Sequence, residues 1–159
     1  NGKAVMYAYI GLSVGDLISG ILSQVLKSRK KVVQLYLGFS LVCVLIFLLM
    51  HDYNITENTY YFMCFLLGTG TGYWAIFVTI AAEQFGTNIR STAANTIPNL
   101  VRGSVNIVVL FFGILVSTGI NDGWSALIVG VLFISLAFFS ISRLTETFGK
   151  DLNYFDETL

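Results

Sequence analysis

Five apolar runs, each long enough to cross a bilayer as a helix, constrain this chain more than any other feature. They cover residues 5–26, 32–50, 60–82, 91–118 and 124–144, and the fourth begins at either 91 or 96. A hydrocarbon core about 30 Å thick needs about 20 helical residues. Only 11% of the residues are charged, against roughly 25% in ordinary soluble domains. The chain is therefore expected to lie in a membrane.

The runs are helical rather than β-barrel in character. The stretch LVCVLIFLLM, at residues 41–50, is apolar on every face, whereas a barrel strand alternates between apolar and polar residues. A helix also satisfies its own backbone hydrogen bonds in lipid. We predict an all-α, multi-pass bundle over residues 1–144, followed by a short soluble tail at 145–159.

The cations between the runs indicate an orientation. One side carries seven of them and the other side only Lys3; the seven are Lys27, Arg29, Lys30, Lys31, Arg90, Arg143 and Lys150. Cationic loops mark the cytoplasmic side, so the start is predicted to lie outside and the tail inside. The expected location is a plasma membrane, here a bacterial inner membrane. A net charge of zero gives no indication of nucleic-acid binding.

Asp16 is an acid inside the first run. It precedes Lys27 by eleven residues, which places it about 16 Å from the cationic end of a helix and near the bilayer midplane. An ionised carboxylate there costs about 2.5–3.5 kcal/mol, so it needs a partner or water. Two interpretations stay open: a titrating group that couples proton movement, and a static ion pair or other structural polar contact.

Small residues recur on the first and third runs. Gly11, Gly15 and Ser19 are spaced four apart, as are Gly68 and Gly72 in the third run. Such ladders let helix backbones approach closely, and the second one also permits hinge-like sliding. Tyr73 and Trp74 follow it in mid-span, where they line either a substrate site or the core.

The fourth run carries a polar face. Asn95, Asn99, Arg102 and Asn106 recur at steps of four, three and four, the spacing that aligns side chains on one side of a helix. Such a face is expected to line a hydrated cavity or a polar interface. Pro98 leaves two starts open for this helix, and we predict the one near Ser91, which places Arg102 about 18 Å inside Arg90.

Enzyme signatures are absent from the sequence. His51 stands alone, Cys43 and Cys64 lack metal spacing, and the glycines of GTGTG, at 68–72, do not follow a strand. We therefore predict no enzyme activity, no metal and no cofactor.

With these motifs in this order, the chain resembles the C-terminal half of a major facilitator superfamily transporter, over nearly its whole length. The family's loop motif reads roughly G-x-L-(A/S)-D-R-x-G-(R/K)-R-(K/R), and the stretch GILSQVLKSRKK is similar to it. The stretch keeps Gly20, Leu22, Ser23, Arg29 and Lys30. Gln24 stands in place of the motif's acid, and Lys27 in place of its second glycine. The family's glycine-rich helix that ends in E-x6-R is similar to the third run, which ends in Glu83 followed by Arg90.

The resemblance implies that the five runs correspond to helices eight to twelve and that another half of the transporter precedes Asn1. It also implies alternating access, in which two halves rock around a central site. A small polar or anionic solute, with a proton as the possible coupling ion, would pass Asp16, Tyr73, Trp74, Asn99, Arg102 and Asn106. A cytoplasmic latch would consist of Gly20, Arg29, Lys30, Glu83 and Arg90.

Two alternatives stay open beside the carrier. The cationic cluster is also explained by topology alone. A membrane scaffold or sensor with the same fold would not transport, and would bind a partner through its tail.

Overall fold

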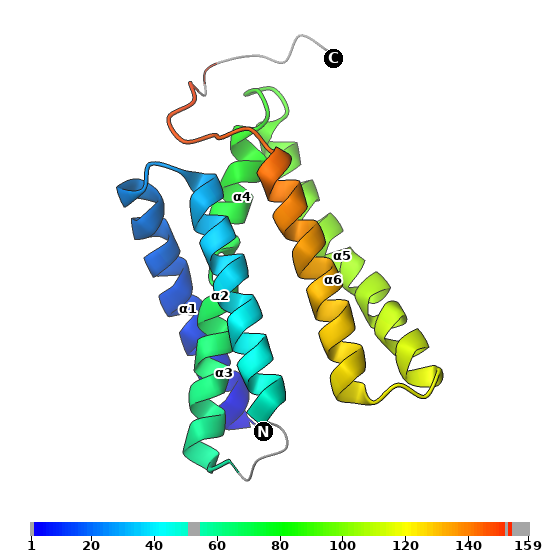
Figure 1. The fold of residues 1–159 in the computed structure, drawn as a ribbon. Coiled ribbons are helices and arrows are strands. Elements are labelled where there is room, and N and C mark those ends of the chain that lie inside the picture. The colour runs from blue at the N-terminus through cyan, green and yellow to red at the C-terminus, as the bar shows by residue number, and fades with distance from the viewer. Residues whose placement is uncertain (1, 51–54, 152, 154–159) are drawn as a thin grey trace.

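A computed structural model describes residues 2–50, 55–151 and 153 of the chain, and the regular elements in this part are helices. They are α1 (Gly2–Val25), α2 (Arg29–Leu49), α3 (Glu57–Thr71), α4 (Trp74–Glu83), α5 (Arg90–Ser117) and α6 (Asp122–Arg143) (Figure 1).

The predicted spans are confirmed as helices that are long and apolar enough to cross a membrane. The spans are Gly2–Val25, Arg29–Leu49, Glu57–Glu83, Arg90–Ser117 and Asp122–Arg143. Each begins one to three residues before its predicted start, because the helices begin in the polar residues that precede the apolar runs, and each ends within one residue of its predicted end. The deeper start of the fourth helix is also confirmed, since α5 begins at Arg90 and Pro98 lies inside it.

The sequence predicted one continuous helix for the third span, but in the structure a two-residue turn interrupts it. The helix α3 ends at Thr71 and α4 begins at Trp74. At the break, the N–H of Tyr73 donates to the carbonyl of Thr71 at 2.9 Å, and the hydroxyl of Ser40 on α2 donates to the carbonyl of Gly70 at 2.7 Å. Glycine weakens a helix, and these bonds satisfy part of the backbone that the break releases.

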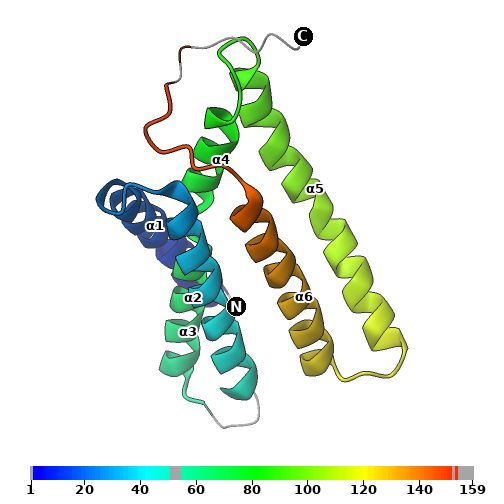
Figure 2. The ribbon, with the colours of Figure 1, turned by 45° about the horizontal axis from the view of Figure 1, so that its top comes forward.

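The helices form two groups joined by α4. In Figures 1 and 2, α1, α2 and α3 lie together, α5 and α6 run beside each other, and α4 stands between the groups. The helix α1 packs on α3, α6 packs on α2, and α5 packs on α4 and α6. The ends that carry the cationic loops gather at the top of Figure 1, which we call the cationic end.

Glycines set the contact between α1 and α3. A Cβ at Gly11 would overlap the carbonyl oxygen of Phe65, and a Cβ at Gly15 would overlap that of Thr69. In the other direction, a Cβ at Gly68 would overlap the carbonyl oxygen of Ala8. These contacts confirm that the two small-residue ladders serve close helix packing.

An apolar cluster near the cationic end holds α2, α4 and α6 together. It consists of Val33, Leu37, Ile76, Ile80 and Ile141, with Tyr73 and Ala137 packed against it. The core of the bundle therefore surrounds α4, which makes this short helix the common neighbour of the groups described above.

Candidate functional site

The short helix α4 connects two sets of polar residues. Asp16 contacts its first turn, and Glu83 is its last residue. Ten helical residues span about 15 Å, so α4 extends from the interior of the bundle to the cationic end.

Asp16 reaches across from α1 to the broken helix. Its Oδ1 accepts a hydrogen bond from the N–H of Ala75 at 3.2 Å, in the turn where a helix has free N–H groups and a partial positive charge. The ion pair found within the described residues joins Arg29 and Glu83, so the contact that the structure gives Asp16 is a cap and not a salt bridge. The titrating role stays a prediction.

Arg102 approaches the same end of α4 from α5. Its guanidinium carbon lies 5.2 Å from the centre of the Trp74 ring, and Trp74 is the first residue of α4. A guanidinium over an indole face is attracted by the ring's electrons. The structure thus brings Asp16, Trp74 and Arg102 to one place, although Arg102 contacts the ring and not the carboxylate.

The amides of the polar face are exposed, as is most of α5. Asn95, Asn99 and Asn106 are exposed, as is Arg102, and Asn95 donates back to the carbonyl of Ser91 at 2.9 Å. Amides in mid-span require water or a polar neighbour. The face is therefore free to meet a hydrated space or a helix beyond this chain.

Tyr73 lies in the core and not on that face. It packs against the apolar cluster and meets Tyr36 edge to face, with ring centres 6.1 Å apart. The sequence had left its role open between core and pathway, and the packing favours the core.

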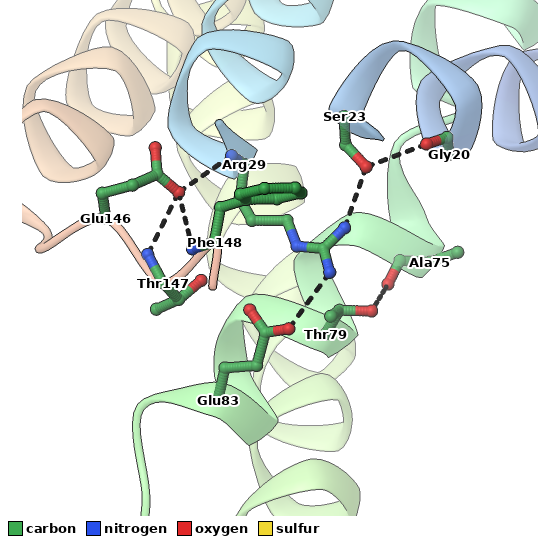
Figure 3. Close-up of polar contacts among 9 residues, drawn as sticks. All are labelled: Gly20, Ser23, Arg29, Ala75, Thr79, Glu83, Glu146, Thr147 and Phe148. Atoms are coloured by element: carbon green, nitrogen blue, oxygen red, sulfur yellow. Dashed lines mark hydrogen bonds and ion pairs between the residues drawn. The ribbon is translucent and has the colours of Figure 1, made fainter. Parts of the chain in front are cut away.

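At the cationic end, Arg29 joins three elements (Figure 3). Its Nη2 donates to Glu83 Oε1 at 3.1 Å, and its Nη1 donates to the hydroxyl of Ser23 at 2.8 Å. Ser23 in turn donates to the carbonyl of Gly20 at 2.9 Å. Gly20 thus enters the predicted latch through its backbone, and a Cβ there would meet nothing within 4 Å.

Lys30 and Arg90 lie at the same end but bind carbonyl oxygens. The ammonium of Lys30 donates to Ser142 at 3.0 Å and to Leu144 at 2.6 Å, where a cation suits the negative end of α6. The Nε and Nη2 of Arg90 each lie 3.3 Å from the carbonyl of Phe85. Lys30 therefore ties α2 to α6, and Arg90 holds the loop that follows α4.

The tail supplies residues that the sequence had not indicated. Glu146 accepts hydrogen bonds from the hydroxyl of Ser28 and from the N–H of Arg29, the latter at 2.9 Å. The ring of Phe148 lies 5.4 Å from the guanidinium carbon of Arg29, and Thr147 is buried. The first residues of the predicted soluble tail thus contact the latch. No spacing rule relates Glu146 to Ser28, 118 residues earlier in the chain. The one available signal was that this acid is predicted to lie on the same side of the membrane as the cationic loops.

We call the set of Ser23, Arg29, Glu83, Glu146 and Phe148 the cationic-end latch. Three buried atoms at this latch have no hydrogen-bond partner within the described part of the chain: Arg29 Nε, Glu83 Oε2 and Thr147 Oγ1. A partly satisfied buried network is less stable than a fully satisfied one, and the gating role of the latch stays a prediction.

The pKa of Glu146 lies below its usual range. Burial alone would raise it, but hydrogen bonds from Ser28 and from the N–H groups of Arg29, Phe148 and Lys30 stabilise the carboxylate and lower it. Because docking lowers this pKa, the carboxylate's contribution is present above the pKa of the undocked residue and is lost as the pH falls through the lowered value.

We therefore expect acid to release the tail, with a midpoint below the ordinary glutamate pKa of about 4.3. A spin label at Thr145→Cys, in a background without Cys43 and Cys64, should gain mobility as the pH falls. Glu146→Gln should show that mobility at neutral pH. Asp151→Asn is the matched control, because the contact that Asp151 makes among the described residues is local, a hydrogen bond from the N–H of Asn153. Equal mobility in both variants at neutral pH would contradict the docking role of Glu146.

Comparisons with known proteins returned no family. No family description matches the chain, no curated protein matches it, and no solved structure matches it.

Proposed function

We propose that this chain is part of a secondary transporter of the major facilitator type, which moves a small polar or anionic solute by alternating access. The observation that carries the proposal is the separate helix α4, with Asp16 at its inner end and Glu83 in the latch at its other end. Discontinuous helices that meet polar groups in mid-membrane are the usual way in which carriers build their sites.

The break lets α4 move without α3. Backbone contacts at Gly11, Gly15 and Gly68 hold α3 to α1, whereas α4 is held by its apolar cluster, the bond from Ala75 to Asp16 and the latch. A change at Asp16 would alter the first turn of α4, and a rigid ten-residue helix would carry that change to Glu83. The proposal thus links the interior carboxylate mechanically to the cationic end.

The solute class is inferred from the exposed polar residues of α5. Arg102 offers a planar set of donors that suits carboxylates and phosphates, and Asn99 and Asn106 flank it with amides that accept and donate. A small anion or a polar molecule with an acidic group matches this set. The rest of the cavity would come from the half of the transporter that lies outside this chain.

Solute uptake into proteoliposomes that contain the complete transporter tests this function. Arg102→Ala is expected to lower kcat/KM for the transported solute at least tenfold, because a hydrogen bond to a charged group contributes about 1.5–3 kcal/mol. Asp16→Asn keeps an acceptor for Ala75 and removes the titrating group, so it should abolish uptake driven by a proton gradient and spare solute exchange.

Ser104→Ala is the matched control, since within the described residues its hydroxyl donates to the carbonyl of Val101 in the same helix. If Arg102→Ala and Asp16→Asn leave uptake and its pH dependence unchanged across a broad solute panel, the pathway assignment is wrong. If the unmodified transporter moves no solute in that panel, a scaffold that presents its tail to a partner becomes the better account.

A further inference from the structure

Two shallow apolar depressions flank α2 below the cationic end. One, of about 340 Å³, is lined by Leu26, Lys31, Gln34, Leu35 and Phe138. The other, of about 320 Å³, is lined by Ile18, Leu35, Tyr36, Phe39 and Thr69. Leu35 lines both, so they meet at this residue and continue on different sides of it.

The dimensions of these depressions match a lipid chain. Lys31 lies one turn above Leu35 and two turns above Phe39 on α2, which corresponds to about 6 Å and 12 Å along the helix axis. One leaflet of the hydrocarbon core is about 15 Å deep. An acyl chain whose head group is at Lys31 would therefore reach the level of Phe39 within its own leaflet.

The charges at the rim select the head group. Lys31 lines the first depression, and Lys27 follows Leu26 in the exposed turn between α1 and α2. The neighbouring cations are engaged elsewhere, Arg29 with Glu83 and Lys30 with the end of α6. In the described part of the chain, neither Lys27 nor Lys31 is in a salt bridge, so the rim carries uncompensated positive charge.

We propose that this surface binds an anionic phospholipid, with its phosphate at Lys31 and Lys27 and its two acyl chains in the depressions that meet at Leu35. The inference does not depend on transport, because it needs only that the chain lies in a bilayer. It also fits the predicted orientation, since the cytoplasmic leaflet carries the anionic lipids. A bound lipid of this kind would rest against α1, α2, α3 and α6, of which α1 and α2 carry the latch residues Ser23 and Arg29.

Lipid retention measured by native mass spectrometry tests the site. The complete protein is taken from nanodiscs that contain equal parts of phosphatidylglycerol and phosphatidylcholine, and the ratio of the two retained lipids is read. A lysine near the membrane surface contributes about 1 kcal/mol to anionic lipid binding, so Lys31→Gln should lower the preference for phosphatidylglycerol about fivefold. Lys27→Asn should act in the same direction, and asparagine tolerates the backbone there, which has φ 48°.

Two further variants separate the groove from the charge. Leu35→Trp fills the meeting point of the depressions and should lower retention of both lipids. Leu49→Trp is its matched control, because Leu49 is exposed at the other end of α2. Lys3→Gln controls for charge. Equal retention of the two lipids by the unmodified protein would overturn the proposal, and so would an unchanged preference for phosphatidylglycerol in Lys31→Gln. Equal losses of lipid retention in Leu35→Trp and Leu49→Trp would also overturn it.

Discussion

Gly15→Ala is expected to destabilise the bundle by about 1–3 kcal/mol, the usual cost of forcing extra atoms into a packed interface. A Cβ at Gly15 would overlap the carbonyl oxygen of Thr69 and lie 2.9 Å from the Cα of Gly72. Both obstacles are backbone atoms, which cannot rotate away as a side chain can. The helices α1 and α3 would have to separate, which would also move Asp16 away from Ala75.

Thermal unfolding in detergent or nanodiscs measures this loss, with Gly20→Ala as the matched control on the same helix. A Cβ at Gly20 would meet nothing within 4 Å, and alanine is favoured over glycine inside a helix by about 0.5–1 kcal/mol. Gly20→Ala should therefore leave the melting temperature unchanged or raise it. Equal losses in the two variants would show that the close approach at Gly15 is not what holds α1 to α3.

Much of the fold could be predicted because a bilayer imposes simple rules on a sequence. Apolar length fixed the position of the spans, and four-residue spacing identified the glycine ladders that the structure places in contact. Helical periodicity likewise placed Asn99, Arg102 and Asn106 on α5, which begins at Arg90, one residue before the predicted start at Ser91. These signals are local, since each depends on residues within one helix.

Contacts between helices explain what the sequence could not show. The break before Trp74 depends on partners from other helices, Ser40 at Gly70 and Asp16 at Ala75, so the glycines alone did not distinguish a break from close packing. The docking of Glu146 joins residues more than a hundred positions apart. Almost every residue has backbone donors and acceptors, so the sequence does not indicate which of them a side chain will bind. Asp16, Lys30 and Arg90 each bind a backbone group in the structure.

If the chain is part of a carrier as proposed, Glu83→Gln is expected to shift it toward the state that is open at the cationic end. The Arg29–Glu83 pair is mostly buried, with side-chain exposures of 14% and 12%, and a hydrogen bond between charged groups contributes about 1.5–3 kcal/mol. If the pair forms only in the closed state, its loss changes the ratio of the two states roughly ten- to a hundredfold. This shift is large because Arg29 is also left buried without its carboxylate.

The double variant Arg29→Gln, Glu83→Gln separates charge from packing. It removes both charges, so neither remains buried and alone, and replacing a pair costs less than breaking it. Its shift should be smaller than that of Glu83→Gln. A larger shift would mean that Arg29 acts mainly through Ser23 and Phe148, its other contacts in the latch.

Labelling of Asn99→Cys from each side of the membrane tests alternating access most directly. Asn99 is exposed on the polar face of α5. A membrane-impermeant maleimide is applied to one side at a time in a background without Cys43 and Cys64. A carrier exposes this position to both sides in turn. Glu83→Gln should then raise labelling from the cationic side about tenfold or more and lower it from the other side. Labelling from one side alone, at a rate that Glu83→Gln leaves unchanged, would contradict alternating access and the role of the latch in it.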